Sequence, residues 1–138
     1  MNYWLIKSEP DAYSFDQLKS DKKTAWTGVR NYAARNNLRA MKKGDCCLYY
    51  HSNIGKSVVG TAVVVKEAYQ DPTTEDASWV CVDVQYNKAF NRPVTLEQIK
   101  SHPVLKNMQF VKQGRLSVSV VSKKEFDVVC ELGLGKEK

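Results

Sequence analysis

The order of hydrophobic and polar positions predicts strands in the middle of the chain and helices around them. Residues 2–7 alternate and are rich in strand-forming side chains, and Pro10 ends this first strand because proline donates no backbone hydrogen bond. β-branched or aromatic runs bounded by turn residues predict four further strands, at residues 46–51, 58–66, 79–86 and 116–121.

Short helices are predicted where a capping residue opens a polar segment. Ser14 and Gln17 have the spacing of a capping box, in which each side chain satisfies a backbone N–H of the other residue, so a helix is expected through Lys19. The same spacing recurs at residues 95–98 and 122–125, and we expect the last helix to end near Gly133. A further short helix is expected at residues 104–108.

The helix predicted at residues 31–41 is amphipathic and cationic. Ala34, Leu38 and Met41 fall on one side at helical spacing, which predicts a buried face. The opposite side carries polar and basic residues, namely Asn31, Arg35, Arg39 and Lys42.

Strands in the middle with helices at the ends, and no regular strand–helix alternation, favour an α+β class. We expect a small mixed or barrel-like sheet with peripheral helices. The 138 residues, 43% of them hydrophobic, suffice for one core, so a single domain over residues 1–138 is expected.

Positive charge is concentrated in one segment. Residues 22–44 contain seven basic residues and no Asp or Glu, whereas the net charge of the whole chain is +6. A solvated helix normally mixes charges of both signs, so this segment favours an anionic partner such as nucleic acid.

Several classes of protein are disfavoured. No apolar run approaches the roughly 18 residues of a membrane span, and the start MNYWLIKSEP lacks a signal-peptide pattern, so a soluble, intracellular protein without a membrane partner is expected. The four cysteines lie in apolar runs without a C-x-x-C pair, which favours reduced core thiols. His51 and His102 lack the spacing of metal ligands, and no metal or cofactor is expected. Lys56 and Ser57 resemble the end of a phosphate loop, but Tyr50 stands where that motif requires glycine.

Aromatic residues are the first candidates for a binding site. Trp26 is flanked by lysines, threonines and a glycine, which favours a pocket wall that stacks a planar ligand, with a core position as the alternative. Trp4 is expected in the core, and Trp79 suits either role. Tyr49 and Tyr50 point to opposite faces of one strand, so we expect one in the core and the other at a site.

Polar candidates lie beside them. Arg30 precedes a helix, where the macrodipole disfavours a cation, so its position favours a bound anion. Asn31 is the expected N-cap of that helix. Arg115 shares a strand face with Ser117 and Ser119, and a surface role and a site role both stay open.

The motifs taken together resemble the EVE domain family along essentially the whole chain. They are YWLIKSEPDAYSFDQL, WTGVRNYAARNNL, KKGD, YYHSN, GTAVVVKEAYQDPT, WVCVDV, RPVTLEQIK and QGRLSV. The resemblance implies a PUA-like small β-barrel with peripheral helices, similar to the YTH domains that hold a methylated adenine in an aromatic cage. It also implies binding of a modified base, of the 5-methylcytosine or 5-hydroxymethylcytosine type, in DNA or RNA.

The resemblance and the candidates above define an expected site. The base-binding pocket comprises Lys7, Ser8, Glu9, Trp26, Gly28, Val29, Arg30, Asn31, Tyr32, Tyr50, His51, Ser52, Trp79 and Arg115. The phosphate contacts comprise Arg30, Arg35, Arg39, Lys42 and Lys43. The chain departs from many relatives at Ile54-Gly55 and Val120, where those have proline. Its loop at residues 70–78 is short, as in bacterial members, so a free-standing, monomeric bacterial protein of the cytoplasm is expected.

Three hypotheses follow. In the first, a non-catalytic module stacks one modified base on Trp26 and holds the flanking phosphates on the basic helix. In the second, an enzyme acts on a nucleic acid or nucleotide in the same pocket, with Glu9 or His51 as the proton carrier. In the third, the basic helix docks an acidic protein.

Overall fold

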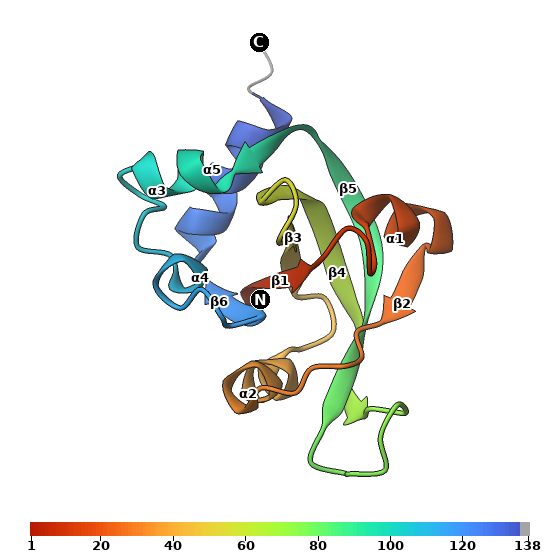
Figure 1. Ribbon diagram of the computed structural model, residues 1–138. Helices are drawn as coiled ribbons and strands as arrows, with labels where there is room; N and C mark the ends of the chain where they lie inside the picture. The colour runs from red at the N-terminus through yellow and green to blue at the C-terminus, as the bar shows by residue number, and fades with distance from the viewer. Residues whose placement is uncertain (136–138) are drawn as a thin grey trace.

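The computed structural model describes residues 1–135, which form one mixed sheet surrounded by helices (Figure 1). The sheet has six strands in the order β2-β5-β4-β3-β1-β6. In chain order the elements are β1 (Tyr3–Ser8), α1 (Phe15–Asp21), β2 (Lys23–Ala25), α2 (Tyr32–Ala40), β3 (Cys46–His51), β4 (Ser57–Gln70), β5 (Val80–Thr95), α3 (Leu96–Ser101), α4 (Gln109–Lys112), β6 (Val118–Val121) and α5 (Lys123–Leu134).

The predicted strands and their alternation are confirmed in outline. β1 pairs in parallel with β3 and antiparallel with β6, and every other pair is antiparallel. Because successive strand residues point to opposite faces, Ile6 and Tyr49 enter one hydrophobic cluster while Leu5 and Tyr50 enter another. Helices α1 and α2 contribute to the first cluster, and α3, α4 and α5 contribute to the second.

The expected closure into a barrel is wrong for the residues that the structure describes. β2 and β6 form the two edges of the sheet and do not pair with each other. The long strands β4 and β5 carry four register shifts, which bend and twist the sheet without closing it. The cavity described below lies between the two edges, since residues of β2 and Ser117, just before β6, both line it.

The ends of several elements differ from the expectation. Residues 103–107 form turns rather than a helix, and the Nδ1 atom of His102 accepts the backbone N–H of Val104 there. The last helix ends at Leu134, one residue beyond the expected Gly133, and Gly135, with φ of +75°, is its C-cap. Gly133 lies inside the helix, where a Cβ atom would come within 2.2 Å of the Phe90 ring.

The buried helix face and the caps predicted at residues 31, 95 and 122 are confirmed. At Ser14 only half of the expected capping box forms, because the Gln17 side chain donates to Asp21 instead. Asn31 caps α2 by accepting the backbone N–H of Ala34, and Thr95 and Ser122 each form a complete capping box. The apolar face of α2 is fully buried, at Ala34, Leu38 and the following Met41. No helix within residues 1–135 is long and apolar enough to cross a membrane.

A candidate base-binding cavity

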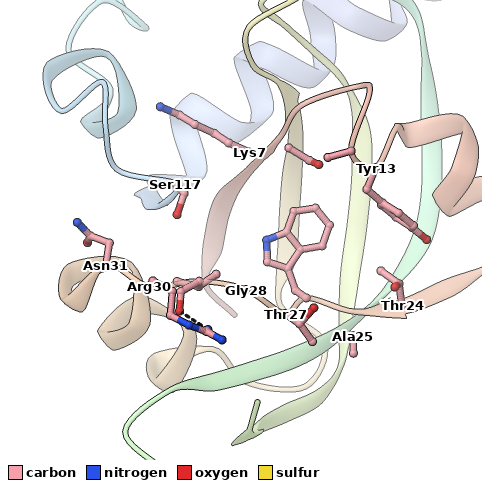
Figure 2. A pocket seen from close by; sticks show the side chains of 13 residues that line it. Lys7, Tyr13, Thr24, Ala25, Thr27, Gly28, Arg30, Asn31 and Ser117 are labelled. Carbon is pink, nitrogen blue, oxygen red and sulfur yellow. Dashed lines mark hydrogen bonds between the residues drawn. The ribbon is translucent and has the colours of Figure 1, made fainter. Parts of the chain in front are cut away.

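A cavity of about 450 Å³ opens between the end of β1 and the segment that joins β2 to α2 (Figure 2). Its volume lies in the range of small-molecule sites. Lys7 and Ser117 lie on one side of it, and Tyr13 and Thr24 lie on the other. The lining consists of Lys7, Ser8, Ala12, Tyr13, Thr24, Ala25, Trp26, Thr27, Gly28, Val29, Arg30, Asn31 and Ser117, and we call it the base cavity.

The lining of the base cavity combines aromatic, hydroxyl and cationic groups. Trp26 and Tyr13 supply rings, while Ser8 and Ser117 are among the hydroxyl side chains. Among residues 1–135, the lining contains two cationic residues and no Asp, Glu, His or Cys. The cavity therefore suits a planar, uncharged group attached to an anionic one.

Trp26 is both a wall of the base cavity and part of the core. Its side chain is 8% exposed, and its backbone N–H donates to the Val82 carbonyl at 2.7 Å. The indole meets the rings of Tyr13 and Tyr49 edge-on, at centroid distances of 6.4 and 5.4 Å. The two roles left open by the sequence are thus combined in one side chain, and the surrounding rings fix the orientation of the indole.

Lys7 brings a partly buried ammonium group to the cavity. Its Nζ atom donates to the Gly114 carbonyl at 2.8 Å. Burial lowers the pKa of Lys7 from its ordinary value, because the charged form loses hydration. Within residues 1–135 no carboxylate forms an ion pair with it.

Asp71 holds the turn that leads from Trp26 to α2. Its fully buried carboxylate accepts the backbone N–H of Gly28 at 2.8 Å and the Nη1 atom of Arg30 at 3.1 Å. Gly28 has φ of +83°, a conformation that glycine adopts without strain. Burial opposes ionisation of Asp71, but bonds from Thr73, Gly28 and Arg30 outweigh it and lower the pKa to about 2.

The ion pair changes the interpretation of Arg30. We expected its place before a helix to require a bound anion, but Asp71 supplies that anion from 41 residues away. The Nη2 atom of Arg30 also donates to Thr73. Arg30 lines the base cavity, yet its charge is already partly neutralised.

The cations of α2 lie beside the base cavity rather than in it. The guanidinium groups of Arg35 and Arg39 donate to the Ser78 carbonyl at 3.4 and 3.3 Å. Lys42 and Lys43 are exposed beyond the end of the helix. None of the four lines the base cavity.

Tyr32 and Trp79 form a stacked pair outside the base cavity. Their ring centroids lie 5.1 Å apart with an interplanar angle of 26°. Tyr32 is 66% exposed, which is unusual for a large aromatic side chain. The Arg35 guanidinium lies 4.9 Å from the Tyr32 ring, so the pair forms an exposed aromatic and cationic surface next to the cavity.

The other expected pocket residues lie elsewhere. Glu9 is exposed, and neither it nor Ser52 lines the base cavity. Tyr49 and Tyr50 are both buried in the core, so the expectation that one of them lies at the base cavity is wrong. Arg115 lines a separate cavity, together with Asn31.

His51 has a structural partner. Its Nε2 atom accepts the backbone N–H of Phe15 at 3.0 Å, which fixes the start of α1. Burial lowers the pKa of His51, although nearby Asp16 acts in the opposite direction. Because Nε2 is engaged and the ring lies outside the base cavity, the geometry gives His51 no access to a bound base.

Sequence reasoning missed several residues around the cavity. Tyr13 and Ser117 were not assigned to the site because only the fold brings them beside β1. Asp71 carried one recognisable signal: Asp-Pro-Thr is typical of a turn in which the aspartate accepts the backbone N–H two residues on, and here Asp71 accepts the N–H of Thr73. The remaining unassigned lining residues are Ala12, Thr24, Ala25 and Thr27.

The cysteines lie away from the base cavity as free thiols. Cys47 and Cys81 are buried, whereas Cys46 and Cys130 are half-buried. Burial raises the pKa of all four, to about 11 for Cys130, which keeps the thiols protonated.

Comparison with known proteins places this arrangement in a family. The chain matches the EVE domain over residues 2–132. It belongs to the EVE domain family. Thymocyte nuclear protein 1 of Gallus gallus is 38% identical over 170 residues, which cover 99% of this chain and 69% of that protein.

Solved structures of similar proteins share the fold of this EVE domain. An NMR structure of a Rhodopseudomonas palustris protein superposes with a TM-score of 0.93 at 44% identity, covering 99% of this chain and 97% of the other. The crystal structure of human THYN1 protein in complex with 5-methylcytosine-containing DNA superposes with a TM-score of 0.90 at 35% identity, covering 100% of both chains.

Proposed function

We propose that this EVE domain is a non-catalytic module that binds nucleic acid through one modified base, of the 5-methylcytosine or 5-hydroxymethylcytosine type. The base enters the base cavity and stacks against Trp26. The observation that carries the proposal is a cavity with aromatic walls, hydroxyl groups and cations, in a domain whose human relative has been crystallised with 5-methylcytosine-containing DNA.

The charge distribution supports a strand that continues outside the cavity. Lys7 and Arg30 lie at the cavity itself, Arg35 and Arg39 lie on the helix α2 that begins beside it, and Lys42 and Lys43 follow the far end of that helix. Phosphates that flank an extruded base need such cations, because backbone contacts provide much of the affinity without carrying sequence information. The exposed Tyr32–Trp79 pair offers a surface on which a neighbouring base can stack.

The composition of the lining also favours binding over catalysis. An enzyme that acts on the base needs a positioned proton carrier, and among residues 1–135 the lining includes no carboxylate or imidazole. The Lys7 and Tyr13 side chains of the lining are engaged elsewhere, because the Lys7 ammonium donates to the Gly114 carbonyl and the Tyr13 hydroxyl donates to Asp21. The hydroxyl side chains of the lining suit recognition of a base edge. The PUA-like class and the bacterial, cytoplasmic setting implied by the family resemblance stay predictions.

The test is a binding panel at one fixed salt concentration. Short single- and double-stranded DNA and RNA oligonucleotides, each with one cytosine, 5-methylcytosine or 5-hydroxymethylcytosine in the same sequence, are titrated with the protein. Burial of one methyl group contributes about 0.8 kcal/mol, so we expect a preference of about fourfold or more for 5-methylcytosine over cytosine.

Three results would contradict the proposal. Equal affinity for modified and unmodified strands would remove recognition of the modification. Mass spectrometry that detects conversion of the oligonucleotide to a new product, in a reaction without added metal, would instead favour an enzyme. Binding to acidic protein with no binding to nucleic acid would favour the docking hypothesis.

A further inference from the structure

A second cavity, of about 230 Å³, adjoins the base cavity. Lys7 lines both of them, so the two cavities share one wall. The second cavity is also lined by Lys56 and Lys100, with Tyr50 and Phe110 supplying aromatic surface. In the part of the chain that the structure describes, its lining contains three lysines and no Asp or Glu.

Lys7 is half-buried, whereas Lys56 and Lys100 are exposed. Its Nζ atom lies 5.6 Å from the centroid of the Phe110 ring and 5.9 Å from that of Tyr50. These rings and the Gly114 carbonyl are neutral partners, so the ammonium is partly desolvated without a counter-charge among residues 1–135. A bound anion would offset that cost.

Lys56 and Lys100 approach the same cavity from two different elements. Lys100 lies in the last turn of α3, and Lys56 lies in the loop between β3 and β4. That loop is fixed to the rest of the molecule, because the Lys56 carbonyl accepts the backbone N–H of Leu96 at 2.9 Å. Neither lysine forms an ion pair within the part of the chain that the structure describes. Separate rigid elements therefore bring three ammonium groups to one hollow, an arrangement that suits a phosphate.

We infer that the second cavity holds a backbone phosphate of the nucleotide next to the base in the base cavity. This inference rests on the proposed function, because it uses the same strand. Lys7 links the two ligand groups, since its side chain lies between the cavity for the base and the cavity for the phosphate. The cations of α2 lie beside the base cavity and contact other phosphates of the strand.

The experiment combines two lysine substitutions with removal of single phosphate charges. The variant is Lys56→Gln with Lys100→Gln, which leaves Lys7 in place because that residue also lines the base cavity. The control is Lys19→Gln with Lys124→Gln, which removes the same charge from exposed positions outside both cavities. Each protein is titrated with DNA that carries one 5-methylcytosine and one uncharged methylphosphonate, placed in turn at each position around the modified base.

The inference predicts one sensitive phosphate. The parent protein and the control should lose affinity when the methylphosphonate occupies a position next to the modified base, and the Lys56/Lys100 variant should show little further loss there. With unmodified phosphates the variant should bind about threefold to thirtyfold more weakly at low salt. Its slope of log affinity against log salt should be shallower than that of the parent by about 0.7 to 0.9 for each lost phosphate contact.

The results separate failure of this inference from failure of the proposed function. If the parent prefers 5-methylcytosine but the variant shows the same methylphosphonate profile as the control, the phosphate subsite is wrong and the base cavity stands. If the parent shows no preference for 5-methylcytosine, the proposed function fails first. An unchanged fold of the variant is checked by its melting temperature, which exposed lysines should affect little.

Discussion

Replacement of Asp71 by Asn tests how the base cavity is held in shape. Asp71 contacts no ligand in this account, since it is fully buried and its oxygens accept from Gly28, Arg30 and Thr73. Asp71→Asn keeps the size of the side chain but removes its charge, and it places an amide group against donors that require an acceptor. The turn from Trp26 to α2 should therefore loosen.

The size of the effect follows from the pKa. A carboxyl group with a pKa of about 2 in the folded protein, against about 3.9 in an unfolded chain, contributes on the order of 2 to 3 kcal/mol of stability near neutral pH. Loss of that amount should lower the melting temperature by about 6 to 15 °C in a domain of this size. The Arg30 side chain is 40% exposed, so solvent screening keeps the loss well below that of a fully buried ion pair.

The direction of the pKa shift of Asp71 determines how the stability of the protein depends on pH. Because the folded pKa is depressed, the stabilisation is present above about pH 4 and is lost as the pH falls toward 2. Urea unfolding gives the free energy of unfolding of the parent and of Asp71→Asn from pH 7 to pH 3. The difference between these two free energies should stay constant down to about pH 4 and become smaller below it. Asp76→Asn is the matched control, because Asp76 lies five residues away in the same loop but is exposed.

Equal stability of Asp71→Asn and Asp76→Asn at pH 7 would refute this reasoning. So would a stability difference that stays constant down to pH 3, because the carboxylate would then not be the source of the effect.

Three further predictions concern residues outside the cavity wall. Arg35→Ala with Arg39→Ala should weaken binding of modified and unmodified strands about equally and flatten the salt dependence measured by titration, because these cations contact phosphates; an unchanged salt slope would contradict it. Replacement of Cys46, Cys47, Cys81 and Cys130 by Ala or Val should lower the melting temperature through lost packing and leave DNA affinity nearly intact, and a loss of binding by the native protein on treatment with chelator or reductant would show a missed role. Gly60→Ala should unfold at lower urea concentration, because the added Cβ atom would lie 2.4 Å from the Phe15 ring and 2.6 Å from the Lys88 carbonyl; an unchanged midpoint would show that both neighbours can move.

Local chemistry predicted most of the fold. Capping residues such as Asn31 and Ser122 act within three or four positions of themselves, so the sequence alone locates the starts of α2 and α5. The three-residue strand β2 was missed because its short polar sequence carries no hydrophobic pattern and it forms by pairing with β5. That the sheet stays open could not be predicted either, since this depends on the bend of β4 and β5 and not on strand propensity.

The residues of the candidate site were likewise predictable only where their signal is local in the sequence. The segment containing Trp26 was recognisable because unmixed positive charge beside an aromatic residue is a local feature. The ion-pair partner of Arg30 could not be recognised from the sequence, because Asp71 lies in a loop 41 residues further along the chain. Tyr32 and Trp79 were expected in the base-binding pocket, but the fold stacks them on each other outside the base cavity.

The central claim is that Trp26 recognises the modified base by stacking, and the ratio of affinities for 5-methylcytosine and cytosine DNA tests it most directly. Loss of one stacked ring costs about 1 to 3 kcal/mol, so Trp26→Ala should bind the modified strand about five- to hundredfold more weakly and lose much of its preference. Trp26→Phe, which keeps an aromatic face, should recover part of both. Because Trp26 also packs in the core, each variant is titrated at a temperature where its unfolding curve shows it fully folded. A folded Trp26→Ala protein that discriminates as well as the parent would contradict the account.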